Sequence, residues 1–256
     1  MTAPATNGGA VTGEDLQFVR AVCPVVHLLG GAWFFAPEVA RVGADAGITD
    51  RFALYAAGRG GVLGDADPAV IASAFAFFPP PVVLARYAEA VAVHPPRDCA
   101  RIYARGLVAW GEARFASVPN IGRLAELARR TADAVRPMGL PLFAGWRAEP
   151  APDHPAAAAA LAMQVLRELR GDLHIHAVTA YGLSPLEAIL GKDGPDRARE
   201  LHYPEPFPPP ERYAARRRAA EDLTDHLVAP AYAVLDHDER AEFLNLTRAA
   251  GHALDG

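Results

Sequence analysis

The sequence has only two cysteines, Cys23 and Cys99, and no long uninterrupted apolar run. With so few cysteines a disulfide framework is not expected, and a reducing compartment is the simpler interpretation. The best candidate for a membrane span, 74–85, is broken by three consecutive prolines and falls short of the roughly 18 residues required. The first residues have neither the basic region nor the apolar core of a signal peptide. We therefore expect a cytoplasmic protein with no membrane partner.

Positive charge is also scarce. The chain has 25 Lys and Arg against 30 Asp and Glu, which gives a net charge of -5. No global basic field therefore favours nucleic acid as a partner. Because 51% of the 256 residues are hydrophobic, the chain can bury a substantial core. We expect a globular protein whose partner is a small-molecule ligand, and its assembly as a monomer or homodimer stays open.

Helical periodicity runs through almost the whole sequence. In 12–29, for example, Leu16, Val19 and Val22 recur at helical spacing. Further helices are expected over 33–46, 69–78, 82–93, 97–116, 121–135, 155–170, 172–181, 184–190, 211–235 and 236–253. The short apolar segment 51–58 is compatible with an extended strand. No alternation is long enough to build a sheet, so the sequence predicts a mainly α fold.

The 23 prolines are about twice the usual share and gather in connecting segments. Five of them fall within 137–155, which indicates a Pro-rich linker between two packed helical bodies. The predicted organisation is a flexible tail over 1–12, a helical body over 13–136, the linker, and a second body over 156–256. Within the second body, 191–210 is poor in periodicity and ends in a sequence that favours polyproline II.

The densest group of ionisable residues is the segment 167–176, Arg-Glu-Leu-Arg-Gly-Asp-Leu-His-Ile-His. Its glycine is expected to end one helix, with Asp172 placed to cap the next. His174 has two interpretations. It is either a hydrogen-bonded core histidine or a ligand-binding and proton-transfer group oriented by Asp172 and Arg170. His176 cannot share a helical face with His174 at a spacing of two residues.

Arg59 follows an apolar segment and lies among glycines, in a turn where backbone can approach a ligand closely. An arginine in this position suits a carboxylate or phosphate group, or an internal partner such as Asp172. The first third of the chain is also rich in aromatic residues: Trp33, Phe34, Phe35, Phe52, Tyr55, Phe75, Phe77 and Phe78. Such a stripe is typical of a core, and the alternative is an aromatic-lined cavity with Arg59, His27 and His174 as its polar anchors.

No nucleophile elbow, nucleotide-binding glycine pattern or zinc-protease motif occurs in the sequence. The hypothetical site therefore rests on residue chemistry alone. Its catalytic candidates are His174, Asp172 and Arg59. Its ligand-binding candidates are His27, Trp33, Phe34, Tyr55, Phe78 and Arg170. No metal ligand set and no cofactor is indicated by motif.

Three function hypotheses follow. The first is a helical small-molecule-binding protein, extended to an enzyme of specialised metabolism that uses acid-base or electrostatic chemistry. The second, which depends on the resemblance that the segments of the next paragraph carry, is a transcriptional regulator whose DNA reader is degenerate. The third is a haem- or metal-binding protein that uses His27 or His174 as a ligand.

Several ordered segments also resemble a group of actinobacterial helix-turn-helix proteins. The segments that carry the resemblance are His27 with 33–38, 55–59 with 63–64, 74–79, 140–145, 166–174, 182–183, and 224–225 before Pro230. The resemblance implies a winged helix between the Gly-Leu pair 182–183 and the Thr-Asp pair 224–225. Here the interval 191–210 is too short for a helix, a recognition helix and a wing, so the DNA reader is expected to be degenerate or lost.

One basic cluster lies near that interval. It consists of Arg212, Arg216, Arg217 and Arg218. We interpret it as a solvated helix face paired with neighbouring carboxylates, in preference to a phosphate-binding face.

Overall fold

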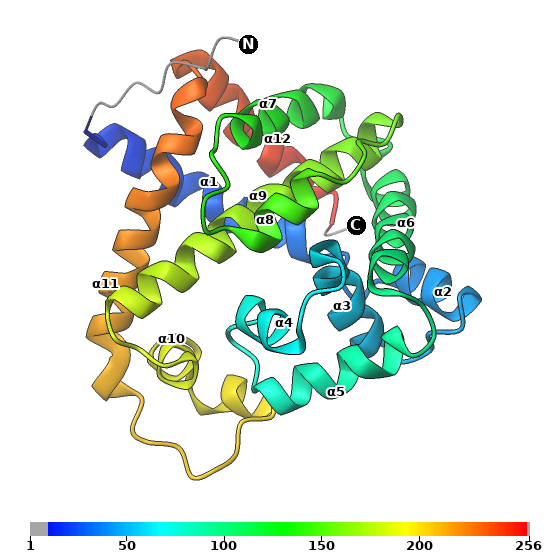
Figure 1. The fold of residues 1–256 in the computed structure, drawn as a ribbon. Coiled ribbons are helices and arrows are strands. Elements are labelled where there is room, and N and C mark those ends of the chain that lie inside the picture. The colour runs from blue at the N-terminus through cyan, green and yellow to red at the C-terminus, as the bar shows by residue number, and fades with distance from the viewer. Residues whose placement is uncertain (1–9, 255–256) are drawn as a thin grey trace.

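The computed structural model describes residues 10–254, and every regular element among them is a helix (Figure 1). The α-helices are α1 (Gly13–Gly31), α2 (Pro37–Asp45), α3 (Arg51–Gly60), α4 (Pro68–Ala74), α5 (Pro80–Val91), α6 (Pro96–Phe115), α7 (Ile121–Asp133), α8 (Pro141–Arg147), α9 (Pro155–Ala180), α10 (Pro185–Glu200), α11 (Glu211–Val228) and α12 (His237–His252). Two short 3-10 helices, η1 (Gly61–Leu63) and η2 (Ala229–Val234), complete the set. The prediction of a mainly α fold is confirmed. Residues 1–9 of the predicted flexible tail lie outside the described residues.

Helix α9 is the axis around which the others pack. It contacts α1, α6, α7, α8 and α11, and 16 of its 26 residues are buried, so other helices cover it on nearly every side. The alanine-rich first half of α9 lets its neighbours approach closely. A Cβ atom added to Gly30 of α1 would lie 2.6 Å from the Met163 carbonyl oxygen, a distance that no side chain tolerates. Close backbone contact therefore fixes α1 against α9.

The predicted helix break at Gly171 is wrong. Helix α9 runs without interruption from Pro155 to Ala180, and Asp172 caps no helix that follows it. Instead the Asp172 carboxylate accepts a hydrogen bond of 3.0 Å from the backbone amide of Phe143 in α8. Packing on both sides of α9 outweighs the cost of about 1 kcal/mol that a glycine imposes on a helix.

The segment that was compatible with a strand, 51–58, is also helical. It forms most of α3, and the Asp50 side chain accepts a hydrogen bond of 2.6 Å from the Ala53 amide at the N-terminus of that helix. The acceptor satisfies a backbone donor that has no partner inside the helix. The capping residue Asp50 thus favours a helix over 51–58, where apolar composition alone was also compatible with a strand.

The Pro-rich interval 137–155 contains the short helix α8. Leu142, Phe143 and Trp146 of α8 are fully buried, so this interval contributes to the core. Buried residues from both sides of the interval belong to one hydrophobic cluster. The division into two helical bodies and their boundaries stays a prediction.

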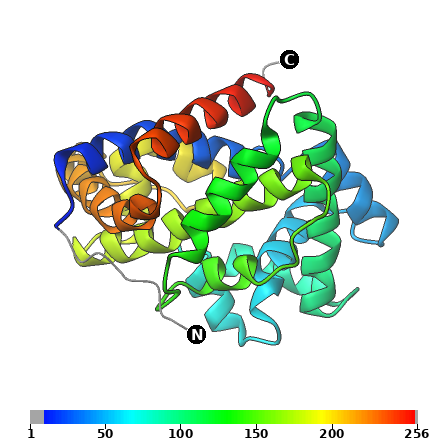
Figure 2. The ribbon, with the colours of Figure 1, turned by 90° about the horizontal axis from the view of Figure 1, so that it is seen from above.

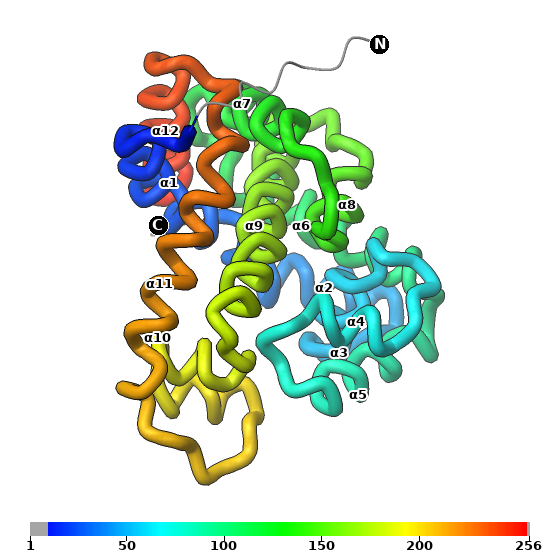
Figure 3. Tube along the Cα trace, turned by 60° about the vertical axis from the view of Figure 1, so that its left-hand side comes forward, coloured from blue at the N-terminus to red at the C-terminus, as the bar shows by residue number. Residues whose placement is uncertain are grey.

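The irregular segment begins later than predicted. Helix α10 continues to Glu200 and is kinked at Gly194, which has a φ of 79°. Pro195 follows at the kink. Residues 201–210 then form the loop to α11 (Figure 3). Within the described residues, the interval 191–210 holds no strand, and the loss of the winged helix stays a prediction. No described helix is long and apolar enough to cross a membrane.

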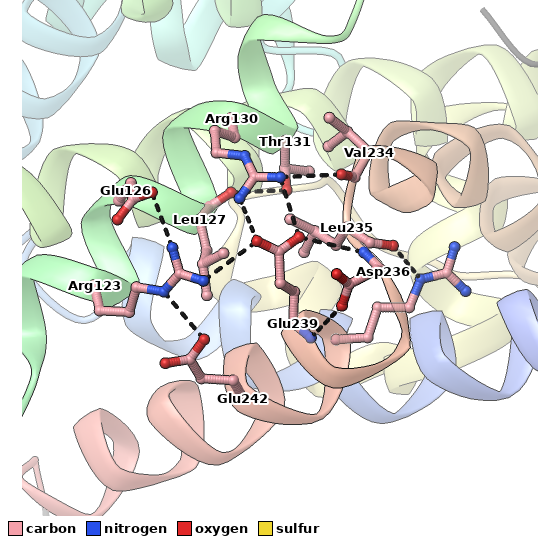
Figure 4. A network of polar contacts seen from close by, with 11 residues as sticks. Arg123, Glu126, Leu127, Arg130, Thr131, Val234, Leu235, Asp236, Glu239 and Glu242 are labelled. Atoms are coloured by element: carbon pink, nitrogen blue, oxygen red, sulfur yellow. Dashed lines mark hydrogen bonds and ion pairs between the residues drawn. The ribbon is translucent and has the colours of Figure 1, made fainter.

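The C-terminal helix α12 packs against α1 and α7 (Figure 2). Glu239 of α12 joins it to α7 by accepting hydrogen bonds from Arg130 and from Arg123, the latter at 3.2 Å (Figure 4). Glu239 also completes the capping box of α12 with Asp236. The hydrogen bonds from Arg130 contribute most to lowering the pKa of Glu239 to about 2.

We expect Glu239→Gln to lower the free energy of unfolding by about 1 kcal/mol at neutral pH. Because the folded-state pKa of Glu239 is depressed, its contribution is complete above the unfolded value of about 4.3 and is lost as the pH falls towards 2. Urea unfolding of both proteins should therefore show a difference that shrinks below about pH 4. The matched control is Glu242→Gln, because Glu242 contacts only Arg123 and is 42% exposed. Equal losses in the two variants would contradict the central role of Glu239.

Candidate functional site

A cavity of about 320 Å³ lies beside the C-terminal half of α9. Residues of α3 and the α4–α5 connection form one wall, and residues of α10 and α11 form the opposite wall. Figure 3 shows these two groups of helices on either side of α9. The volume is at the lower end of the range that is typical of small-molecule sites.

One face of α9 forms the floor of this cavity. Arg167, Arg170, Gly171 and His174 line it, and their spacing of three and four residues places them on a single helical stripe. Gly171 leaves this floor open. A Cβ atom added there would meet no group nearer than the Glu168 carboxylate, at 3.9 Å.

His174 is held in a single tautomer. Its Nδ1 atom lies 2.8 Å from the hydroxyl oxygen of Thr224, which donates its own proton to the Ala220 carbonyl at 2.7 Å. With that hydroxyl proton on the Ala220 carbonyl, Nδ1 carries the hydrogen of the ring and donates it to Thr224. The other ring nitrogen, Nε2, is therefore an acceptor.

The Nε2 atom of His174 is buried and has no hydrogen-bond partner among the described residues. The imidazole is only 7% exposed and stacks on Phe77 with ring centroids 5.6 Å apart. Burial, followed by the charge of Arg217, lowers the pKa of His174 to about 3. The ring is therefore neutral at physiological pH and presents an unused acceptor beside the cavity.

The predicted turn at Arg59 is wrong, because Arg59 lies in the last turn of the helix α3. It lines the same cavity but is already paired. Its Nε and Nη2 atoms donate to the two carboxylate oxygens of Glu168 at 2.7 and 2.6 Å, and Gln164 donates to the same carboxylate at 2.8 Å. Glu168 is fully buried. Burial alone would raise its pKa, but the charge and hydrogen bonds of Arg59 outweigh that effect and hold the pKa below its ordinary value. This pair ties α3 to α9.

The structure brings together most of the residues predicted from sequence. Seven of them line the cavity: His174, Arg59, His27, Phe34, Tyr55, Phe78 and Arg170. Asp172 and Trp33 lie elsewhere. The Asp172 carboxylate binds the N-terminus of α8, and burial raises the pKa of Asp172 to about 7. Trp33 is fully buried, and its indole donates a hydrogen bond to the Gly30 carbonyl at 2.9 Å.

Sequence reasoning missed Arg167 and Arg217. Arg167 lies two helical turns before His174 on the cavity face of α9, a relation that the predicted break at Gly171 concealed. Arg217 was assigned to a solvated face, yet it is only 6% exposed and lines the cavity from α11. Helical periodicity within α11 gives one signal for it, because Arg217 lies four residues after the buried Tyr213.

The described residues hold no group of three or more His, Cys, Asp or Glu side chains arranged to bind a metal ion. His27 and His174 do line one cavity, so the hypothesis of haem or metal ligation by either residue stays a prediction.

These features define the described part of the molecule as an all-helical protein with an open cavity of mixed aromatic and cationic lining. The chain belongs to the helix-turn-helix family, whose model matches residues 19–207. The match includes the α9 face of the cavity and ends before the basic cluster on α11. No curated protein and no solved structure matches the chain.

Breaking the Arg59–Glu168 pair should be strongly destabilising. We expect Arg59→Met to cost about 3–5 kcal/mol, because it leaves the fully buried Glu168 carboxylate without its main partner. Urea unfolding measures the loss. Arg86→Met is the matched control, since Arg86 pairs with Glu89 on the surface and its removal should cost far less. Similar losses of unfolding free energy in both variants would show that the buried ion pair stabilises the fold no more than the surface pair does.

His174 should also impose a pH dependence on stability. Its folded-state pKa of about 3 lies below the unfolded value of about 6.5, so only the unfolded chain binds this proton between those values. Stability should therefore fall with decreasing pH by up to about 1.4 kcal/mol per unit in that window. His174→Asn keeps a donor for Thr224 and should remove this slope from urea unfolding curves. An NMR titration that finds the His174 pKa near 6.5 in the folded protein would contradict the assignment.

Proposed function

We propose that this protein binds a small organic molecule in the cavity beside α9. The observation that carries the proposal is the Nε2 atom of His174, a buried ring nitrogen at the cavity without a partner among the described residues. Leaving such a group unsatisfied costs about 1–3 kcal/mol. Because Nε2 is covered by neighbouring side chains, a donor on a bound molecule recovers this free energy once a side chain at the cavity wall shifts to admit it.

The aromatic lining supports the same function. Phe34, Tyr55, Phe77 and Phe78 line the cavity, and the rings of Tyr55 and Phe78 lie with centroids 6.0 Å apart. Aromatic walls with a few polar groups are the usual composition of small-molecule sites. They favour a ligand with a flat or hydrophobic part.

Acid-base chemistry, if the protein is an enzyme, depends on His174. A neutral imidazole with a free Nε2 atom accepts a proton or a hydrogen bond. Asp172 is engaged by α8 and Arg59 by Glu168, so neither assists His174 directly. We therefore propose ligand binding as the function, and a reaction in specialised metabolism as its extension.

Screening a library of flat aromatic metabolites by thermal shift, followed by calorimetry, tests the proposal. His174→Asn retains the hydrogen bond to Thr224 but removes the Nε2 acceptor, and we expect it to weaken ligand binding about tenfold. His176→Asn is the matched control, because His176 is exposed and does not line the cavity. The proposal fails if no library member binds, or if the His174 variant binds as tightly as the wild type. An absorption spectrum of the purified protein tests the haem alternative, which requires a Soret band.

The description of the family supports DNA binding as a second candidate function. Of the basic cluster on α11, however, Arg217 faces the cavity, while Arg216 is exposed and donates to the Gly182 carbonyl at 3.2 Å. Arg212 and Arg218 are the remaining exposed members. Two or three arginines on a chain of net charge -5 supply few phosphate contacts. We expect no salt-dependent mobility shift with duplex DNA, and a shift abolished by Arg212→Ala with Arg218→Ala would favour the regulator hypothesis.

A further inference from the structure

We infer that the ligand of this cavity is an organic anion, to which Arg167 on one wall and Arg217 on the other supply cationic contacts. The inference rests on the proposed function and adds the chemical class of the ligand. It follows from the charge of the lining, from the pairing of each cation, and from the aromatic surface beside them.

The cavity is cationic although the chain as a whole is acidic. Six cationic side chains line it: Arg59, Arg167, Arg170, Lys192, Arg197 and Arg217. Only two acidic side chains, Asp193 and Glu221, line it with them. In a protein of net charge -5 this local excess of positive charge attracts anions to the cavity.

Partners within the chain satisfy some of these cations. Arg59 is held by both oxygens of Glu168, and Arg197 donates to Glu200 at 2.7 Å. Arg170 donates to Glu221 at 2.5 Å. These three arginines therefore have a carboxylate in direct hydrogen-bonding contact.

Arg167 lacks such a partner. Its Nη1 atom lies 3.8 Å from Glu168 Oε1, an oxygen that already accepts hydrogen bonds from Arg59 and Gln164. Its Nε atom is buried without a hydrogen-bond partner in the described chain. The guanidinium lies over the Phe34 ring, 4.5 Å from its centroid. The two Nη atoms are not occluded as Nε is and form no hydrogen bond with any described residue, so they leave donor capacity for an anion.

Arg217, on the opposite wall, is ion-paired but incompletely hydrogen-bonded. Its Nη1 atom is 2.6 Å from Glu221 Oε1, but Nε and Nη1 form no hydrogen bond with any described residue. Glu221 must also serve Arg170 and Lys192, so one carboxylate faces three cations. Burying cations with too few counter-charges is costly, and a bound anion offsets that cost.

The aromatic walls indicate that this anion is part of a larger organic molecule. Phe34, which supports the Arg167 guanidinium, lies next to Tyr55, with ring centroids 5.2 Å apart. A ligand that reaches Arg167 therefore also contacts an apolar surface. Inorganic phosphate would fill only a fraction of the cavity of about 320 Å³ and would leave these rings without a partner.

Gly171 gives a separate indication that the space is used. It lies on the cavity floor between Arg167 and His174, in the interior of α9, where a glycine costs about 0.5–1 kcal/mol relative to alanine. No described group lies closer than 3.9 Å to an added Cβ atom, so the packing of the chain does not require glycine. A bulkier side chain would occupy the floor on which the ligand lies.

Calorimetry with matched probes tests the inference on the wild-type protein. The probes are 2-naphthoate, its neutral amide 2-naphthamide, 1-naphthyl phosphate and inorganic phosphate. We expect the naphthyl anions to bind at least about tenfold more tightly than the amide and than inorganic phosphate, which corresponds to about one charge-assisted pair. The preference for the anion should decrease as salt is added.

Single-residue variants then test which side chains bind the anionic group of the ligand. Arg167→Met and Arg217→Met should each reduce the affinity for 2-naphthoate to that for the amide, whereas Arg217→Lys should retain part of the preference. Arg216→Met is the matched control, because Arg216 neighbours Arg217 on α11, is exposed and does not line the cavity. Gly171→Leu should weaken the binding of both naphthyl anions while the protein remains folded, as judged by its melting temperature.

The outcomes separate this inference from the proposed function. Equal binding of 2-naphthoate and 2-naphthamide overturns the anion and leaves a small-molecule site. A preference that survives in both the Arg167 and Arg217 variants overturns the assignment of these residues. Inorganic phosphate binding as tightly as 1-naphthyl phosphate overturns the organic class. If none of the probes binds, both the inference and the proposed function are contradicted.

Discussion

The buried carboxylate of Glu168 is the constraint on which the cavity depends. It lies on the central helix with no exposure, and a buried charge of this kind persists only with compensating partners. Arg59 supplies both donors of its guanidinium fork, and Gln164 supplies a third hydrogen bond. The requirement to neutralise one carboxylate thereby fixes α3 against α9 and defines one wall of the cavity.

The same pair determines which groups remain for a ligand. Arg59 occupies the Glu168 carboxylate. Arg167, which precedes Glu168 in the chain, therefore keeps only a distant ion contact of 3.8 Å with it. Thr224 has a parallel role on the other wall. It uses its proton on the Ala220 carbonyl and so leaves His174 with an acceptor at Nε2. The Arg59–Glu168 pair thus leaves Arg167 without a close partner, and the Thr224–Ala220 hydrogen bond leaves Nε2 of His174 without one. Arg167 and His174 are among the groups that we propose for ligand binding.

The helical content was predictable because local patterns encode it. Apolar residues recur at helical spacing in α1, and the Thr12 and Asp67 N-caps lie where capping residues are expected. The prediction failed at Gly171, where an intrinsic preference of about 1 kcal/mol was outweighed by packing on both sides of α9. It was incomplete at α8, which is short and proline-flanked and is stabilised by burial of Phe143 and Trp146.

By itself the sequence determined the helical class, the acidic balance and the residue types available for a site, because each of these is local or compositional. It also pointed to His174 and Arg59, since polar groups embedded in apolar segments must find a partner. Only the tertiary structure decided the partners. It placed Asp172 against α8, turned Arg217 inward, and left Nε2 of His174 beside a cavity. These outcomes depend on contacts between residues tens of positions apart, which helical periodicity along one segment does not encode.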